Sequence, residues 1–180
     1  RDCLLSRGLG DVYKRQEQVA DTAASDEEAV LENKIAEYDA FLTKQDPAFT
    51  VEELEEAMQK VMDQYAGGIG THYQFNEKQL GMAEEKIKKL QILAKGLAAA
   101  DMHELMFIYE LKERLTVCLT VIAHLRARKE TRWHSFAENL DYPEKSDAWL
   151  CYVNSKKNGD QITMIRRDLV KGGETYEHRD

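Results

Sequence analysis

The chain is 180 residues long, with 43% hydrophobic and 32% charged residues and a formal net charge of −8. This composition predicts one folded domain, or one and a half, and excludes wholesale disorder. The acidic balance argues against a nucleic-acid-binding protein, which needs a basic face. Since no run of about 18 apolar residues occurs, we expect no transmembrane helix.

The cysteine content favours a reducing compartment. The cysteines are Cys3, Cys118 and Cys151, an odd number without the CxxC spacing of a zinc ribbon. Disulfide scaffolds are typical of secreted proteins and carry paired cysteines. We therefore expect a cytoplasmic protein without a disulfide framework.

The first sixteen residues look foreign to the rest of the chain. The first methionine is Met58, and residues 11–16 resemble the translation of a sequencing adapter. We interpret residues 1–16 as a sequencing or translation artefact, disordered and outside the fold, attached to a fragment of a longer protein. A native basic N-terminal arm is the alternative interpretation.

Two acidic helices are predicted next. Residues 26–43 carry apolar side chains at helical spacing until Asp46-Pro47 interrupts them. Thr50 and Glu53 have the spacing of a capping box for a second helix, which the glycines within residues 67–70 end. Residues 17–66 hold 14 acidic and three basic side chains. This excess indicates a solvated acidic face or, alternatively, a docking surface for a basic partner.

Two further helices complete the predicted bundle. After a start near Asn76, an apolar residue recurs every three or four positions from Leu80 to Leu97. Asp101 and Glu104 have the spacing of another helix start. The helix predicted from Met102 to about Lys129 is apolar on nearly every side. We therefore expect other helices and a further surface to cover it on most sides.

The chain after this long helix loses its helical periodicity. Residues 142–147 are predicted to form a loop, and two alternating strands flank Asn158-Gly159, a strong hairpin signal. The predicted fold is mainly α, a three- to four-helix up-down bundle followed by a C-terminal extended segment with a β-hairpin. We assign residues 17–48 to a linking helix, residues 49–132 to the helical bundle and residues 133–180 to the extended tail.

The sequence lacks the patterns of a resident metal or nucleotide site. Di-iron bundles use Glu-x-x-His pairs, and none of the five histidines has an acidic residue three positions before it. The glycines within residues 67–70 lack the further Gly, or the Gly-Lys-Ser/Thr, of a phosphate-binding loop, so a helix stop is favoured over a nucleotide loop. We assign no catalytic, cofactor-binding or metal-binding residue within this chain.

The densest polar cluster follows the long helix. Four cations, a carboxylate, an indole and an imidazole fall within residues 126–134, more than a helix C-terminus needs to balance its dipole. Arginine suits carboxylates at interfaces, and tryptophan buries a large area there. We predict a domain or subunit interface, with a direct substrate or cofactor role as the alternative. The candidate interface residues are Arg126, Arg128, Glu130, Arg132, Trp133, His134, Tyr142 and Trp149.

The same region carries a family resemblance. Residues 128–133 (RKETRW), followed by Asp141-Tyr142-Pro143-Glu144 and Asp147-Ala148-Trp149, resemble the C-terminal signature of the succinate dehydrogenase and fumarate reductase flavoprotein family. Within that family the chain resembles the adenylylsulfate reductase branch, also through residues 62–68, 76–78, 101–105 and 151–156. The similarity spans about residues 30–157. Residues 134–139 and 162–168 depart from that branch, which leaves adenylylsulfate, fumarate or a related compound open as the substrate.

The resemblance implies the C-terminal helical domain of an FAD-dependent reductase subunit, an oxidoreductase of electron transfer and sulfur metabolism. It implies an FAD domain upstream in the same protein, on which this chain would pack, and an iron–sulfur partner subunit that supplies electrons. The family's catalytic residues lie upstream, so the chain alone is expected neither to bind FAD nor to be catalytic. The alternative is a stand-alone acidic helical interaction module without a catalytic role.

Overall fold

The computed structural model describes residues 27–134, 136–159 and 161–169. The chain divides into two compact units, residues 1–40 and 41–180, and each is described by itself. Helix α2 (Glu27–Leu42) lies almost wholly in the first unit. The sequence assigned residues 1–16 to an artefact, and these residues lie outside the described part of the chain. No helix in the described part has the length and apolar character needed to cross a membrane.

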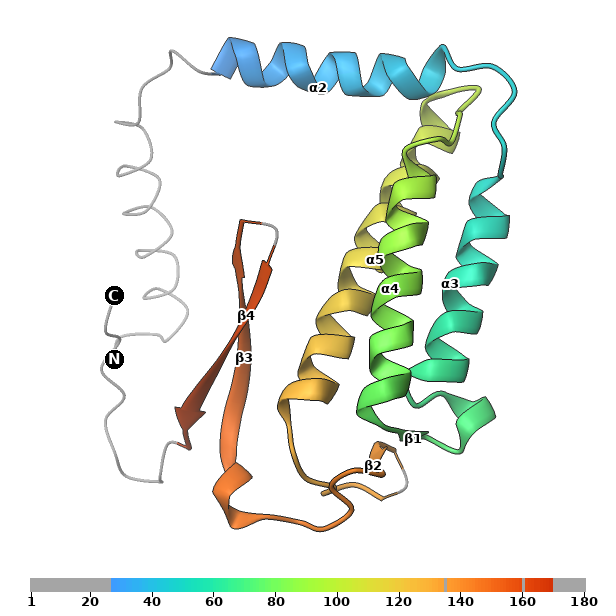
Figure 1. Cartoon of the computed structure of the whole chain (residues 1–180). Coiled ribbons are helices and arrows are strands. Elements are labelled where there is room, and N and C mark those ends of the chain that lie inside the picture. The colour runs from blue at the N-terminus through green and yellow to red at the C-terminus, as the bar shows by residue number, and fades with distance from the viewer. Residues whose placement is uncertain (1–26, 135, 160, 170–180) are drawn as a thin grey trace, which may run out of the picture. The chain divides into compact units, whose positions relative to one another are not determined.

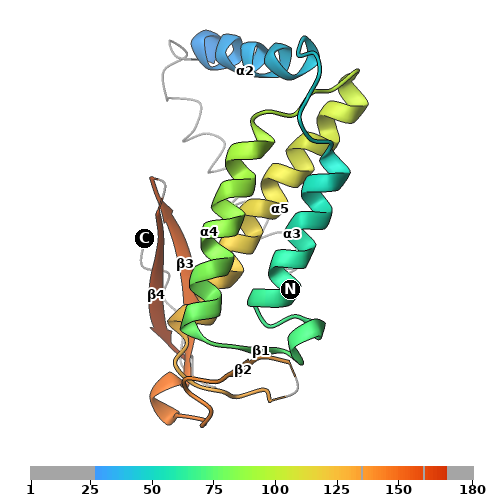
Figure 2. The same ribbon diagram turned by 45° about the vertical axis from the view of Figure 1, so that its right-hand side comes forward.

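The second unit is built around three helices, α3 (Val51–Tyr65), α4 (Glu77–Ala94) and α5 (Met102–Ala127). They run alternately up and down and lie side by side, as Figures 1 and 2 show from two directions. The side chains at helical spacing on their facing sides form the core, which confirms the predicted mainly α architecture. The buried core includes Leu54, Met58, Leu80, Ala83, Ile87, Leu90, Leu105, Ile108, Leu111, Leu115 and Ile122.

The helix starts follow the predicted capping chemistry. The hydroxyl of Thr50 accepts a hydrogen bond from the Glu53 backbone N–H, and the Glu53 carboxylate accepts one from the Thr50 N–H. The Asn76 side chain caps α4 by accepting from a backbone N–H, and Asp101 caps α5 by accepting from two. The Glu104 carboxylate reaches back one residue further than predicted, to the N–H of Ala100.

A two-residue parallel strand pair joins segments that are far apart in the sequence. Strand β1 (Gln74–Phe75), in the loop before α4, pairs with β2 (Glu138–Asn139), which follows α5. Gly67 has a φ of +75° in the turn that leads toward β1, a conformation that glycine adopts readily. The sequence did not predict this pair. It fixes the loop between α3 and α4 against the segment after α5.

The predicted C-terminal hairpin is present. Strands β3 (Cys151–Asn158) and β4 (Gln161–Asp168) pair antiparallel in full register, and both contact α5. Gly159 has the positive φ expected of the turn. One face of the hairpin half-buries Val153, Ile162 and Met164, whereas the other exposes Tyr152 and Ile165.

Helix α5 is less covered than its sequence predicted. One side of the helix is buried in the bundle, but several apolar residues on the other side are exposed to solvent. Two helices and a hairpin cannot enclose a helix that is apolar all round, so one face stays open within the described part of the chain. The exposed apolar residues of α5 are Met102, Met106, Phe107, Val117 and Val121.

Candidate functional site

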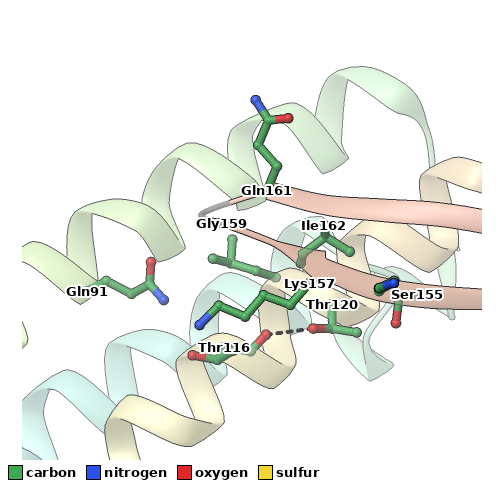
Figure 3. A pocket seen from close by; sticks show the side chains of 10 residues that line it. Gln91, Thr116, Thr120, Ser155, Lys157, Gly159, Gln161 and Ile162 are labelled. Atoms are coloured by element: carbon green, nitrogen blue, oxygen red, sulfur yellow. Dashed lines mark hydrogen bonds between the residues drawn. The ribbon is translucent and has the colours of Figure 1, made fainter. Parts of the chain in front are cut away.

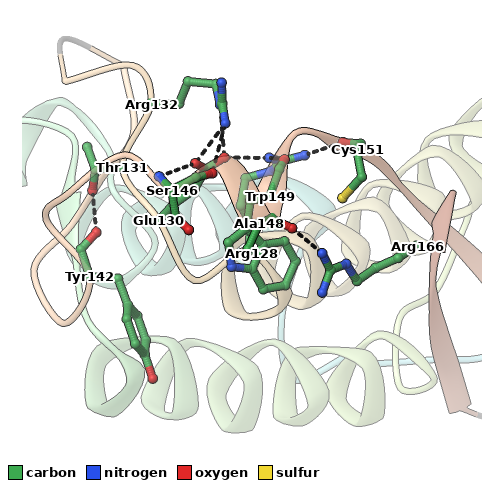
Figure 4. Close-up of polar contacts among 10 residues, drawn as sticks. All are labelled: Arg128, Glu130, Thr131, Arg132, Tyr142, Ser146, Ala148, Trp149, Cys151 and Arg166. Carbon is green, nitrogen blue, oxygen red and sulfur yellow. Dashed lines mark hydrogen bonds and ion pairs between the residues drawn. The ribbon is translucent and has the colours of Figure 1, made fainter. Parts of the chain in front are cut away.

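Glu130 is the centre of the polar region that follows α5. Its side chain is fully buried, and its carboxylate accepts four hydrogen bonds (Figure 4). Oε1 accepts from Arg128 Nη1 at 2.6 Å and from Arg132 Nε at 2.9 Å. Oε2 accepts from Arg132 Nη2 at 2.9 Å and from the Ser146 backbone N–H at 3.0 Å. A buried carboxylate is tolerated because its lone pairs are filled and its charge is paired.

These contacts fix the protonation state of Glu130. Burial raises the pKa of a carboxyl group, but the hydrogen bonds from Arg132, Ser146 and Arg128 outweigh burial and lower the pKa of Glu130 to about 2. Glu130 therefore stays ionised near neutral pH. It cannot serve there as a general acid or base, and its role is to hold the two arginines.

The two guanidinium groups in turn hold the chain that leads to the hairpin. Arg128 donates from Nη1 to the carbonyl oxygen of Trp149 at 2.9 Å and from Nη2 to that of Cys151 at 3.0 Å. Arg132 donates from Nη2 to the carbonyl oxygen of Ser146 at 3.2 Å. The end of α5 is thus tied to residues 146–151 through side chains that meet backbone oxygens (Figure 4).

Thr131 closes the neighbouring loop. It is fully buried, and its hydroxyl donates to the carbonyl oxygen of Tyr142 at 2.9 Å and accepts from the Asn139 N–H at 2.9 Å. Its own N–H donates to the carbonyl oxygen of Glu144 at 3.2 Å. The sequence analysis did not identify Thr131 and Asn139 as structural residues, because a buried polar side chain and an exposed one look the same in a sequence.

Three other predicted residues lie apart from Glu130. Arg126 binds two carboxylates of α4, Glu77 at 2.7 Å and Glu84 at 2.5 Å, and therefore joins α5 to α4. Trp149 stacks against the Arg166 guanidinium, whose carbon lies 4.3 Å from the ring centroid. The Lys129 Nζ atom lies over the ring of Tyr142, 5.8 Å from the ring centroid.

The remaining two predicted residues face solvent. Trp133 is 67% exposed, and Phe136 on the same tight turn is 73% exposed. The ring of Phe136 lies 6.5 Å from that of Tyr73, which precedes β1. We call Tyr73, Trp133 and Phe136 the aromatic patch. His134 is exposed, and its Nδ1 lies 3.4 Å from Glu138 Oε1.

Tyr73 and Phe136 were not among the predicted interface residues. Phe136 stands three positions after Trp133 in a polar loop, and two large aromatics so close together outside regular structure could have drawn attention to it. Tyr73 carried no comparable signal, because its approach to Phe136 depends on the pairing of β1 with β2.

Candidate metal sites are absent from residues 27–134, 136–159 and 161–169. No group of three or more His, Cys, Asp and Glu side chains in these ranges could hold a metal ion. The hollow of about 390 Å³ between the hairpin tip and α4 and α5 is lined by neutral polar groups, two lysines and the apolar side chains of Leu119 and Ile162 (Figure 3). There Thr120 already donates its hydroxyl to the Thr116 carbonyl oxygen. The described lining of this hollow includes no His, Cys, Asp or Glu side chain.

Comparisons with known proteins identify relatives of this chain. A family model described as the fumarate reductase flavoprotein C-term matches residues 55–174. The alpha subunit of adenylylsulfate reductase from Megalodesulfovibrio gigas is 34% identical over 98 residues, which cover 54% of this chain and 15% of that protein. The structure of adenylylsulfate reductase from the hyperthermophilic Archaeoglobus fulgidus has a TM-score of 0.75 at 31% identity, covering 84% of this chain and 26% of that one.

A more distant structure shares the fold. The quinol fumarate reductase of E. coli has a TM-score of 0.66 at 19% identity and covers 89% of this chain and 28% of that one. At that identity the likeness shows the fold alone. This chain spans about a quarter of the length of the two solved structures.

Proposed function

Because the chain belongs to the fumarate reductase flavoprotein C-terminal family, we propose that it is the C-terminal helical domain of an FAD-dependent reductase subunit. The family resemblance predicted from the sequence is confirmed. Since the chain spans about a quarter of its solved relatives, the FAD and the catalytic residues are assigned to the rest of the longer protein. The chain itself has the role of a supporting domain.

We assign the longer protein to the adenylylsulfate reductase branch. The relatives that are 31% and 34% identical to this chain are both adenylylsulfate reductases. The fumarate reductase is 19% identical, so it supports the fold and carries no argument about substrate. Adenylylsulfate is therefore the proposed substrate, and fumarate is the competing one.

The observation that carries the domain role is the aromatic patch. Trp133 and Phe136 expose 67% and 73% of their surface, although the loop that bears them is fixed by the buried Glu130 and Thr131. A loop that is held by buried contacts and presents large aromatic side chains to water is typical of an interface core. We propose that the patch packs on the FAD domain of the same protein.

The second proposed partner is an iron–sulfur subunit that supplies electrons. Its support is the name of the curated relative, which is the alpha subunit of an enzyme with more than one kind of chain. Three of the candidate interface residues face solvent, namely Trp133, His134 and Tyr142. Their side chains are available to either partner.

The cytoplasm is the proposed compartment. Cys118 and Cys151 are free thiols in the described part of the chain, as a reducing environment allows. Burial raises the pKa of the Cys118 thiol, which keeps it protonated and unreactive. This cysteine behaves as a small apolar side chain of α5.

The function is tested on the longer protein encoded by the same gene. The coding sequence upstream of Glu17 is determined first, and the whole protein is then purified and its absorbance spectrum and reductase activity are measured. We expect a strand–GxGxxG–helix unit upstream, a bound flavin, and electron transfer to adenylylsulfate faster than to fumarate. A start codon directly before residue 17, or a protein without flavin, would contradict the proposal and favour the stand-alone interaction module. Faster reduction of fumarate would overturn the branch assignment alone.

A further inference from the structure

A small amphipathic pocket lies beside the aromatic patch. Its volume is about 230 Å³, and it opens where the end of α5, strand β1 and the start of β3 meet. Its lining combines the charged groups of the Glu130 cluster, which we call the charged wall, with apolar side chains. The lining residues that matter are Arg128, Glu130 and Arg132 of the charged wall, together with His124, Phe75 and Trp133.

The charged wall holds hydrogen-bond donors that the cluster does not use. Each guanidinium has five N–H bonds. Arg132 directs Nε and Nη2 at Glu130 and Ser146, and Arg128 directs Nη1 and Nη2 at Glu130, Trp149 and Cys151. Among the described residues, Arg132 Nη1 and Arg128 Nε therefore lack a hydrogen-bond partner. Both side chains are partly accessible, at 19% and 32% exposure.

The charges of the pocket wall do not cancel. Two guanidinium groups and one carboxylate line the pocket, which leaves a net positive charge among these three side chains. Asp147 also attracts Arg132, but it is exposed and does not line the pocket. The ligand chemistry that fits is a carboxylate next to a flat apolar group. Arg132 Nη1 and Arg128 Nε can each donate a charge-assisted hydrogen bond to a carboxylate, and the indole of Trp133 offers the apolar surface.

Glu130 also prepares the pocket for such a ligand. Its hydrogen bonds fix the orientation of both guanidinium groups before anything binds, so a ligand does not have to order them. A site of this size that holds a single carboxylate binds a free small molecule weakly. A carboxylate carried on the same polypeptide needs little intrinsic affinity, because its effective concentration is on the order of millimolar or higher.

We propose that this pocket receives an aspartate or glutamate side chain, with an adjoining apolar residue, from the FAD-bearing part of the same longer protein. The inference rests on the proposed function and adds the chemistry of one contact to it. The source is the same polypeptide because this chain spans 26% of its solved relative, and because the pocket adjoins the patch assigned to that interface. The carboxylate anchors the charged wall, and the aromatic patch buries the surrounding area.

The pocket is tested by nuclear magnetic resonance of the ¹⁵N-labelled 180-residue chain. The indole N–H signal of Trp133 is followed during titration with 3-phenylpropionate and, separately, with 3-phenylpropionamide, which has the same shape without the charge. Trp149 is the one other tryptophan, and the variant Trp149→Phe assigns the two signals. We expect a saturable shift with the carboxylate and binding at least about tenfold weaker with the amide. Equal binding of the two probes, or no shift with either, would overturn the pocket.

Matched variants test the role of the free Arg132 Nη1 group. Arg132→Lys keeps the positive charge but loses this N–H donor, and we expect it to weaken carboxylate binding about fivefold or more. Arg114→Lys changes an arginine that binds Glu55 and Glu110 on the bundle surface, and carboxylate binding should be unchanged. If Arg132→Lys binds the carboxylate as well as the unaltered chain does, Arg132 Nη1 is not part of the site.

The occupant is tested by repeating the titration with the longer protein. We expect the Trp133 signal there to be insensitive to 3-phenylpropionate, because the protein's own carboxylate fills the pocket. Binding that is as strong as in the isolated chain would overturn the assigned occupant. This result is independent of the flavin and activity measurements, so the failure of the pocket and the failure of the proposed function can be told apart.

Discussion

Arg132 donates two parallel hydrogen bonds to Glu130, from Nε to Oε1 and from Nη2 to Oε2, both 2.9 Å long. The bidentate geometry is the strongest form of arginine–carboxylate pairing. In the sequence the two residues look like surface charges, but in the structure they form a buried ion pair that joins the end of α5 to the loop at Ser146. We call this ion pair the clamp. The loop that carries Trp133 and Phe136 depends on this clamp.

The clamp predicts a large effect of Glu130→Gln on stability. The glutamine has no charge, so Arg128 and Arg132 lose their counter-ion. Its side-chain NH₂ group would also face N–H donors instead of an acceptor. The free energy of unfolding should therefore fall by about 3 kcal/mol. Urea denaturation followed by circular dichroism measures this. The matched control is Glu56→Gln, which breaks the exposed pair with Lys60 on α3 and should leave the unfolding midpoint unchanged. Similar midpoints for the two variants would show that the clamp does not stabilise the chain.

The same clamp predicts a pH dependence. The pKa of Glu130 is about 2 in the folded chain, against an ordinary value of 4.5. Because the folded value is the lower one, the stabilisation is fully present above about pH 4.5 and is lost as the pH falls toward 2. The difference in unfolding free energy between the unaltered chain and Glu130→Gln should therefore shrink between about pH 5 and about pH 2. A difference that stays constant over that interval would contradict the depressed pKa.

Much of the fold was predictable because local chemistry determines it. The caps at Thr50, Asn76 and Asp101, the apolar spacing of the helices and the turn at Gly159 each act over a few residues. The pairing of β1 with β2 was not predictable, since it joins two residues on each side across 64 positions of sequence. Strands so short carry no alternating pattern.

The candidate site was predictable in location and less so in arrangement. The sequence placed the important residues between Arg126 and Trp149. It could not show that Arg128, Glu130 and Arg132 bind one another, because a charged residue is usually exposed. Trp133 was the one member of the aromatic patch that was predicted, and the predicted residues His134 and Tyr142 also face solvent. The interface role of these residues stays a prediction.

Two glycines offer a matched pair of substitutions. A Cβ atom at Gly68 would lie 2.3 Å from Asp63 Cα and 2.8 Å from Asp63 O, so the backbone would have to move. We expect Gly68→Ala to lower the unfolding free energy by about 2 kcal/mol. Gly81 lies within α4, where a Cβ atom would meet open space, and Gly81→Ala should raise the unfolding free energy by about 1 kcal/mol through helix propensity. Thermal denaturation of both variants checks the predicted opposite signs.

The aromatic patch predicts different effects in the isolated chain and in the longer protein. Because Trp133 and Phe136 are mostly exposed, replacing both by Ala should change the stability of the isolated chain by no more than about 1 kcal/mol. In the longer protein the same double substitution should lower the unfolding midpoint and weaken flavin retention, since it removes the interface core. Tyr152→Ala, on the exposed face of the hairpin, is the control and should do neither.

Hydroxyl-radical footprinting tests the central claim most directly, namely that this chain is a domain packed on the rest of a flavoprotein through the aromatic patch. Side-chain oxidation at Trp133 and Phe136 is quantified by mass spectrometry in the 180-residue chain and in the longer protein, with Ile92 on α4 as an exposed reference. The account predicts that oxidation of both aromatics falls about fivefold or more in the longer protein, because an interface core excludes water. Equal oxidation of Trp133 and Phe136 in the two proteins would contradict it.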